Sequence, residues 1–235
     1  MTDLASRIAE NLARVQTRIA DAARASGRQA DQVQLVAVTK YVGDEEVRAL
    51  AAAECRDFGE SRPQQLWQKA EQLADVDCRW HQIGHLQRNK VARTLPLIDL
   101  LHSVDSERLL RAVDEAAAGL GRRVPVLLEV NISGEAAKHG LAPEEIAPLL
   151  PAAASLAHIE VRGLMAMAHL AGGREQARID FAQLRELRDC LQADCPEGVA
   201  LGELSMGMSD DFDLAIREGA TIVRVGSALY EGLPR

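Results

Sequence analysis

Aromatic residues and cysteines are scarce in this sequence, and both shortages restrict what the protein can be. Phenylalanine, tryptophan and tyrosine together make up 3% of the chain, so a core must be built from alanine, leucine, valine and isoleucine. Enough of these residues are present, because 47% of the chain is hydrophobic. The four cysteines form no CxxC pair and have no histidine at zinc-finger spacing. We therefore expect free thiols in a reducing cytoplasm.

Long apolar runs and an excess of positive charge are also missing. No apolar run approaches the roughly 20 residues that a membrane helix needs, and the first residues do not resemble a signal peptide. The formal net charge of -8 gives no general electrostatic reason to bind nucleic acid or an anionic membrane. We expect a cytoplasmic protein that binds neither of these.

Apolar runs typical of strands alternate with amphipathic stretches along most of the chain. The spacing of apolar residues predicts a first helix over 3–26. Strands are then predicted over 34–39, 55–59, 79–83, 98–103, 124–132, 159–165, 201–205 and 221–226. Helices are predicted between them, over 44–54, 63–74, 85–94, 106–119, 143–157, 174–193 and 210–218. This order predicts a single (β/α)8 TIM-like barrel over residues 1–235, with an extra N-terminal helix. An open doubly wound sheet is the alternative, although the first turn lacks a GxGxxG motif.

Lys40 stands at an unusual place, directly after the first buried strand. The chain has only four lysines against 23 arginines, so a lysine here is notable. An ammonium group that loses solvent has a lowered pKa and becomes a nucleophile toward carbonyl groups. The structural alternative is a lysine that extends to solvent from the end of a strand.

Small and hydroxyl-bearing residues follow the last two predicted strands. Barrel enzymes often bind phosphate between these two loops, where glycine lets the backbone approach an anion closely. The residues that could do so here are Ser205, Gly207, Ser209, Gly226 and Ser227. An ordinary helix start at Ser209 is the alternative, and because two acids follow it, we expect the anion nearer Ser205 and Gly226.

Arg224 lies within the apolar last strand and shares a face with Ile222. A buried arginine needs a partner, which could be Glu129, Glu203 or a ligand in the barrel mouth. A Schiff-base lysine and a phosphate site together suggest pyridoxal 5'-phosphate (PLP). Because guanidinium only donates hydrogen bonds, Arg224 would keep the ring nitrogen of PLP unprotonated and weaken the ring as an electron sink.

Several ordered blocks of the sequence resemble one known family over nearly the whole chain. The blocks are Val36–Lys40, Phe58–Glu60, Trp80–Gln87, Asn89–Lys90, His102–Asp105, Val130–Ser133, Gly163–Met165, Leu204–Ser209 and Val223–Gly226. They resemble the PLP homeostasis protein family, also called the YggS or PLP-binding protein family.

The resemblance implies a barrel like the N-terminal domain of alanine racemase, without the second domain of the racemases. It implies PLP as an aldimine on Lys40 and Arg224 facing the pyridine nitrogen. It further implies phosphate contacts from Ser205, Gly226 and Ser227 with backbone help around Met206 and Gly207, and ring contacts from Ile83 and Met165. Ser61 replaces the usual asparagine of the family, which puts a hydrogen bond near the ring hydroxyl in doubt.

The function that the resemblance implies is PLP homeostasis: the protein buffers PLP or delivers it to apoenzymes, without robust catalysis. A PLP-dependent racemase is the first alternative. It needs an acid or base on each face of the alpha carbon, and Lys40 can serve only one face. The chain has only two tyrosines, Tyr41 and Tyr230, and in the racemases the second base comes from the domain that is missing here. A Schiff-base aldolase that binds a sugar phosphate is the second. We expect a monomer, because the chain forms one domain and has no obvious exposed apolar stripe. We expect no metal site, because the histidines do not converge on a metal pattern. Lys138 is expected to be a solvated loop lysine, with a second aldehyde site as the alternative.

Overall fold

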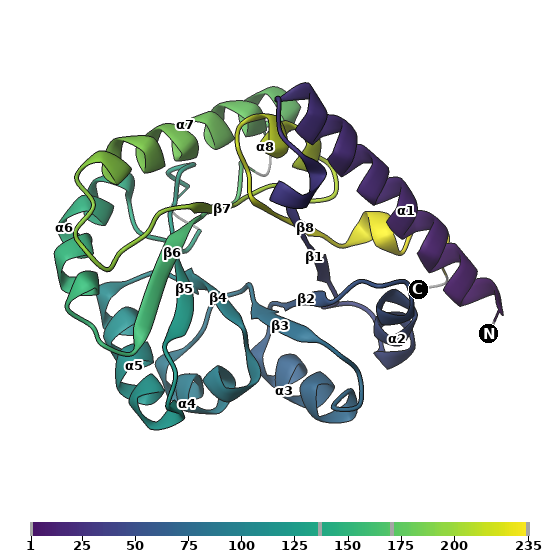
Figure 1. The fold of residues 1–235 in the computed structure, drawn as a ribbon, viewed down its shortest axis with the longest axis horizontal. Coiled ribbons are helices and arrows are strands. Elements are labelled where there is room, and N and C mark those ends of the chain that lie inside the picture. The colour runs from purple at the N-terminus through teal and green to yellow at the C-terminus, as the bar shows by residue number, and fades with distance from the viewer. Residues whose placement is uncertain (1, 136–137, 170–171, 234–235) are drawn as a thin grey trace.

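Eight parallel strands close into a barrel in the order in which they occur along the chain (Figure 1). The computed structural model describes residues 2–135, 138–169 and 172–233. The strands are β1 (Gln34–Val38), β2 (Asp57–Glu60), β3 (Arg79–Gln82), β4 (Leu100–Val104), β5 (Val124–Glu129), β6 (Ile159–Met165), β7 (Glu203–Ser205) and β8 (Ile222–Val225). The helices are α1 (Thr2–Ala25), α2 (Asp44–Ala52), α3 (Pro63–Gln72), α4 (Val91–Thr94), α5 (Glu107–Ala117), α6 (Pro143–Ala154), α7 (Gly173–Ala193) and α8 (Phe212–Arg217). The predicted (β/α)8 barrel with an additional N-terminal helix is confirmed.

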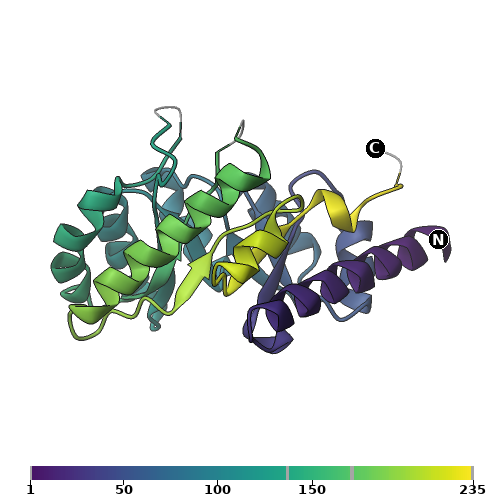
Figure 2. The same ribbon diagram turned by 90° about the horizontal axis from the view of Figure 1, so that it is seen from above.

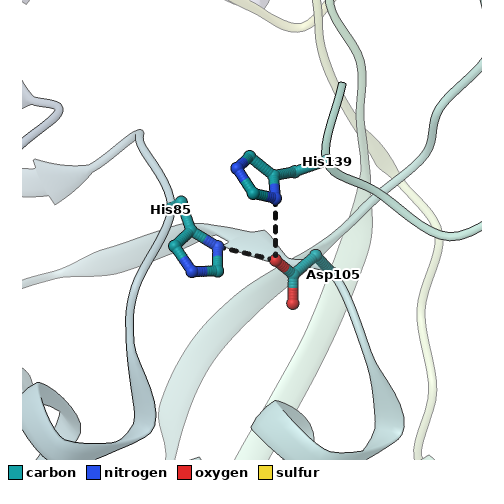
Figure 3. Close-up of side chains that lie close together, drawn as sticks. All are labelled: His85, Asp105 and His139. Atoms are coloured by element: carbon teal, nitrogen blue, oxygen red, sulfur yellow. Dashed lines mark hydrogen bonds and ion pairs between the residues drawn. The ribbon is translucent and has the colours of Figure 1, made fainter. Parts of the chain in front are cut away.

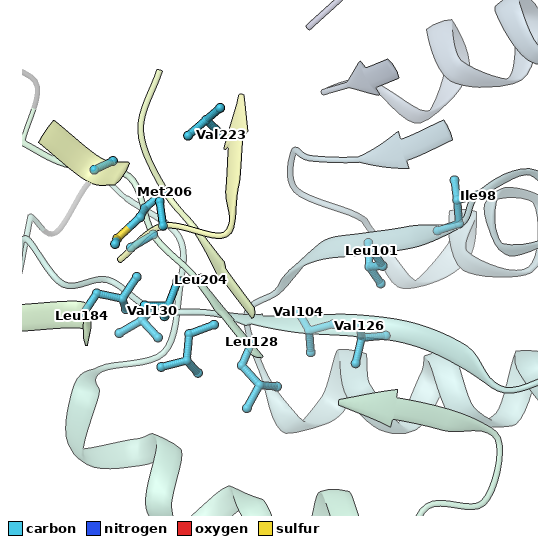
Figure 4. Close-up of a cluster of buried hydrophobic side chains, with 14 of the residues drawn as sticks. Ile98, Leu101, Val104, Val126, Leu128, Val130, Leu184, Leu204, Met206 and Val223 are labelled. Atoms are coloured by element: carbon cyan, nitrogen blue, oxygen red, sulfur yellow. The ribbon is translucent and has the colours of Figure 1, made fainter. Parts of the chain in front are cut away.

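The strands bury side chains on both faces, which explains their nearly continuous apolar sequences. Alternate residues point into the barrel, where one apolar cluster contains Val36, Leu100, Leu127, Met165 and Ile222. The intervening residues point outward and pack with the helices in the larger cluster, part of which is shown in Figure 4. The barrel is therefore a packed core, and side chains at the carboxyl ends of its strands face the mouth.

Helix α1 lies outside the barrel against α2 and α8 (Figures 1 and 2). Its apolar stripe is buried, from Ile8 to Ile19, as its periodicity predicts. Asn11 on this helix donates hydrogen bonds to the carbonyls of Leu229 and Glu231, at 3.1 and 3.0 Å. These bonds fasten the segment after β8 to the first helix.

The bounds of several predicted elements differ from those observed, and two differences affect the barrel mouth. The helix predicted over 85–94 is reduced to α4, with short 3-10 turns on either side at Arg88–Lys90 and Leu95–Leu97. The carbonyl of Gly84 accepts hydrogen bonds from Gln82 and Ser103, which holds this segment in a loop. The strand predicted over 124–132 ends at Glu129. None of the helices in the described ranges is long and apolar enough to cross a membrane.

Candidate functional site

Lys40 lies two residues beyond β1, at the mouth of the barrel. The preceding residue, Thr39, is fully buried, donates its N–H to Gly59 at 3.0 Å and donates its hydroxyl to Glu60 Oε1 at 2.8 Å. Lys40 itself is half-buried, and its Nζ lies 4.9 Å from the centre of the exposed Tyr41 ring. The position at the end of a buried strand is the one that the sequence predicts.

A second lysine supports this strand end from behind. Lys69 on α3 is buried, and its Nζ donates hydrogen bonds to the carbonyl of Thr39 and to Glu60 Oε1, both at 2.5 Å. The carboxylate of Glu60 is fully buried. Sequence reasoning missed this pair, because helical spacing alone does not show that Lys69 turns toward the barrel. The pair fixes the backbone directly before Lys40.

The loops after β7 and β8 contact each other, as a phosphate site between them requires. Ser209 Oγ accepts hydrogen bonds from the N–H groups of Gly226 and Ala228, at 3.1 and 3.3 Å. Ser227 is exposed beside them. A Cβ atom at Gly226 would lie 3.4 Å from Val38 Cβ, so the end of β1 borders the same loops. Lys40 and the predicted phosphate region therefore lie at neighbouring strand ends on the same side of the barrel.

Met206 and Gly207 shape the loop after β7 through backbone and packing. The Met206 side chain is fully buried in the outer cluster (Figure 4), and its N–H donates to the carbonyl of Ile222 at 3.1 Å. Gly207 has a φ of +90°, and a Cβ atom there would lie 2.5 Å from Ala215 Cβ and 2.9 Å from Phe212 Cα. Glycine is thus required for both the conformation and the close approach to α8.

Gly207→Ala is expected to lower the free energy of unfolding by about 2–4 kcal/mol, because the strained backbone and the clash both contribute. Chemical denaturation measures this loss. Gly121→Ala is the matched control, since Gly121 also has a positive φ, of 65°, but a Cβ atom there would have no neighbour within 4 Å. The control should lose only about 1–2 kcal/mol. Equal losses in the two variants would contradict the importance of the contact with α8.

Arg224 points into the barrel and is buried, with 4% of the residue exposed. Its Nη1 donates to Ser205 Oγ at 2.6 Å and its Nη2 donates to the carbonyl of Ala166 at 3.0 Å. Burial lowers the pKa of Arg224 to about 10, and the charges of Glu129 and Asp211 oppose this shift. The guanidinium is therefore still charged at neutral pH.

Neither carboxylate predicted as a partner of Arg224 forms a hydrogen bond with it among the described contacts. Glu203 accepts a hydrogen bond from Thr221 instead. Glu129 acts on Arg224 through its charge. Its Oε2 is buried without a hydrogen-bond partner in the described structure, and burial together with the charge of Asp105 raises the pKa of Glu129 to about 7.

Ser205 lies inside the barrel, where its hydroxyl already has partners. The alternation along β7 turns Leu204 and Met206 outward and Ser205 inward, where it is fully buried. Its hydroxyl is shared between Arg224 Nη1 and His102 Nδ1, which lies 2.9 Å away. This placement favours a role in holding Arg224 over the predicted contact with phosphate.

The remaining predicted residues lie around the same interior. Met165 is buried in the inner cluster with Val36 and Ile222. Ile83 is half-buried, and its Cδ1 would lie 3.2 Å from a Cβ atom at Gly59, so it lines the barrel beside β2. Ser61 is half-buried after β2, and its carbonyl accepts a hydrogen bond from Gln82 at 3.1 Å.

Comparison with known proteins gives consistent results over nearly the whole chain. Residues 6–234 match the family model described as "Alanine racemase, N-terminal domain". The chain is 42% identical to the pyridoxal phosphate homeostasis protein of Pseudomonas aeruginosa, over 96% of this chain and 95% of that one. It is 36% identical to the structure of PipY from Synechococcus elongatus with PLP bound, with a TM-score of 0.84 and coverage of 94% and 99%. The chain belongs to the PLP homeostasis protein family.

This PLP homeostasis family member shares its barrel fold with the alanine racemases. An alanine racemase of Clostridium difficile has a TM-score of 0.75 and 15% identity, and the match covers 98% of this chain but 58% of the racemase. The family member thus corresponds to the barrel part of that enzyme.

The residues at the mouth suit PLP, judged by their own chemistry. Lys40 supplies an amine for the aldehyde, and the buried guanidinium of Arg224 supplies donors for the ring nitrogen, which is an acceptor. For the phosphate group, Gly226 leaves space beside its backbone N–H and Ser227 supplies a hydroxyl. Glu129 Oε2, buried without a hydrogen-bond partner in the described structure, leaves one polar atom near Arg224 that a ligand could contact.

Two histidines of this family member converge, contrary to the sequence prediction. His85 Nδ1 lies 2.8 Å from Asp105 Oδ2, and His139 Nδ1 lies 4.0 Å from the same oxygen (Figure 3). Their potential ligand atoms lie within 4.8 Å of one another. The two rings stack at 4.3 Å with an angle of 14°, so their in-plane lone pairs do not meet at one point. We interpret the cluster as a contact between the loops after β3 and β5.

Lys138 is not the solvated loop lysine that the sequence predicts. Its Nζ donates to the carbonyl of Ala168 at 2.7 Å and to Ser133 Oγ at 3.1 Å, and it forms an ion pair with Glu135. These contacts tie the loop after β5 to the segment after β6. The sequence does not reveal this arrangement, because one of the acceptors, the carbonyl of Ala168, lies 30 residues away.

Proposed function

We propose that the protein binds PLP at the barrel mouth through a Schiff base with Lys40 and acts in the cytoplasm as a carrier that buffers the cofactor or delivers it to apoenzymes. The observation that carries this proposal is the convergence of three groups on one mouth: the lysine after β1, the arginine within β8, and the loops after β7 and β8. The family membership and the PLP in PipY support it.

Each residue has a defined role in this proposal. Lys40 Nζ holds the aldehyde carbon, Arg224 donates a hydrogen bond to the ring nitrogen, and the loops with Gly226 and Ser227 hold the phosphate. Ser209, which already joins these loops, takes the place that the sequence predicts for Ser205. Ile83 and Met165 form apolar walls beside the ring, and Ser61 lies near its edge.

The arrangement supports holding PLP more than using it for catalysis. PLP, when bound, supplies an electron-withdrawing ring, and this withdrawal is strongest when the ring nitrogen is protonated. Arg224 has no proton to give at neutral pH, because its pKa stays near 10 even after burial. We infer that carbanions are stabilised poorly at this site.

A second acid or base, which racemisation requires, is not offered by the tyrosines. Tyr230 is half-buried with its hydroxyl buried, and burial raises the pKa of this hydroxyl. Tyr41 is exposed beside Lys40 rather than opposite it, at 4.9 Å from Nζ. This placement favours the carrier over the racemase.

Delivery to an apoenzyme is supported by the distribution of exposed apolar side chains. Among the described residues, the large hydrophobic side chains with high exposure are Tyr41, Met167 and Met208. They follow β1, β6 and β7, so all three surround the mouth. We propose that a monomer presents this rim to its recipient.

An amino-acid racemase assay tests the proposal against its main alternative. Purified protein loaded with PLP is incubated with L-alanine and a panel of other amino acids, and the D-enantiomer is measured by chiral chromatography. We expect no more turnover than with free PLP at the same concentration. Protein-dependent turnover that disappears in Lys40→Ala would show an enzyme. A colourless protein that cleaves a sugar phosphate would show the aldolase.

A further inference from the structure

Five buried polar side chains form a continuous hydrogen-bonded chain through the interior of the barrel. Asp57 Oδ1 lies 3.1 Å from His81 Nε2, and His81 Nδ1 lies 2.9 Å from His102 Nε2. His102 Nδ1 lies 2.9 Å from Ser205 Oγ, which in turn lies 2.6 Å from Arg224 Nη1. All five residues are at most 7% exposed. The chain therefore connects the start of β2 to the arginine under the mouth.

The two ends of this chain, together with the neutral ring of His102, favour one arrangement of the hydrogens between them. Burial alone would raise the pKa of Asp57, but hydrogen bonds from His81 and Arg79 hold it below its usual value, so Asp57 is an ionised acceptor. Arg224 can only donate. Burial, with the neighbouring His81 and Arg224, lowers the pKa of His102 well below its usual value, so this ring is neutral.

The bonds then run in one direction. In the arrangement that keeps both rings neutral, His81 donates from Nε2 to Asp57, and its Nδ1 accepts the Nε2–H of His102. The Nδ1 of His102 is then an acceptor, and the hydroxyl of Ser205 donates to it. Ser205 Oγ therefore directs a lone pair at Arg224 and accepts its hydrogen bond, because a guanidinium group can only donate.

We propose that Asp57, His81, His102 and Ser205 are positioning residues that fix the place and orientation of Arg224 through this one-directional chain, and thereby set the hydrogen bond that Arg224 offers to the ring nitrogen of PLP. The proposal rests on the proposed function, because the ring nitrogen is that of the proposed cofactor. The direction of the hydrogen bonds is a property of the free protein.

The anchoring end of the chain lies at the opposite face of the barrel. Asp57 also accepts hydrogen bonds from Gln34 at 2.8 Å and from Arg79 at 2.7 Å. These residues line a cavity of about 530 Å³ between α1 and the first residues of β1 to β3. The charge of Asp57 is thus held by two donors besides His81. At the other end, Arg224 faces two carboxylates outside the chain, Glu129 and Asp211.

Nitrogen-15 NMR of the histidine rings in the PLP-free protein tests the direction of the chain. We expect His81 and His102 both to carry their hydrogen on Nε2 at neutral pH, with Nδ1 of each ring as an acceptor. In Asp57→Asn the ionised acceptor is lost, so His81 should show both tautomers. An Nδ1–H tautomer of either ring in the wild-type protein overturns the proposal.

PLP binding to matched variants tests the positioning role. Asp57→Asn should weaken PLP binding roughly tenfold and shift the pH dependence of the bound-PLP absorption band by about one unit, because Arg224 is less firmly oriented. Asp180→Asn is the control. Asp180 is also a buried aspartate that binds a histidine, His169, at 2.9 Å, but it lies outside the chain. Both variants should lose stability, and only Asp57→Asn should change the affinity for PLP and the pH dependence of its absorption band.

The outcomes separate this proposal from the proposed function. Wild-type protein that binds PLP, with equal spectra and affinities in the two variants, overturns the positioning role and leaves the PLP site intact. Wild-type protein that forms no adduct with PLP overturns both. Ser205→Ala provides a second variant in the chain, and it should reproduce the cofactor changes of Asp57→Asn, because Arg224 Nη1 then loses its acceptor.

Discussion

Lys40→Ala is expected to abolish covalent binding of PLP. The wild-type protein should show a visible absorption band with PLP, and borohydride reduction should fix the adduct on the peptide that contains Lys40. In the variant the band and the adduct should disappear, and PLP should be lost on gel filtration. The free energy of unfolding should change by no more than about 0.5 kcal/mol, since Lys40 is half-buried and its described contact is the Tyr41 ring.

Lys90→Ala is the matched control for this experiment, because Lys90 is also half-buried but lies in the 3-10 turn after β3. It should retain the band and the adduct. An adduct that maps mainly to Lys138 or Lys90 in the wild-type protein would show that the PLP site has been misplaced. Absence of any adduct would make the aldolase with a sugar-phosphate ligand the better hypothesis.

Lys69→Met is expected to lower the free energy of unfolding by about 3–5 kcal/mol, the usual cost of removing one partner of a buried ion pair. Lys69 Nζ lies 2.5 Å from Glu60 Oε1, and the carboxylate that remains would be fully buried without its cation. The carbonyl of Thr39 also loses its donor. Urea denaturation measures the stability, and the rate of PLP adduct formation reports on the position of Lys40.

A double variant separates charge from packing in this prediction. Lys69→Met combined with Glu60→Gln removes the orphaned charge while the amide can still accept the hydroxyl of Thr39. It should recover a substantial part of the lost stability. If the double variant is as unstable as the single one, the loss comes from packing around Lys69 and the ion-pair explanation is wrong.

The sequence predicts the barrel well because the pattern of apolar residues that indicates each strand and helix is local. Strands buried on both faces are apolar throughout, and their alternation with amphipathic helices needs no knowledge of contacts. The same alternation within β8 correctly turns Arg224 inward with Ile222. The failed helix over 85–94 has suitable periodicity, but hydrogen bonds to the carbonyl of Gly84 hold the segment in a loop. Tertiary contacts override propensity there.

The parts of the site that sequence reasoning missed depend on partners distant in the chain. Ser205 meets His102 across 103 positions, and Lys69 meets the carbonyl of Thr39 across 30. His85 and His139 come from loops after β3 and β5 and share Asp105 (Figure 3). Spacing in the sequence identifies chemically suitable residues at strand ends, but it does not show which of them pair.

The open position of Lys40 bears on how long PLP would stay bound. Lys40 is half-buried, and both Tyr41 and Ser227 beside the site are exposed, so the described residues leave this part of the mouth open to water. Enzymes that close over a covalent intermediate protect it from hydrolysis. Here the residence time of bound PLP would be governed by the attack of water on the Lys40 linkage. If PLP is held as we propose, its release rate would be set by the chemistry of that linkage, and the occupancy of the site would follow the free PLP concentration.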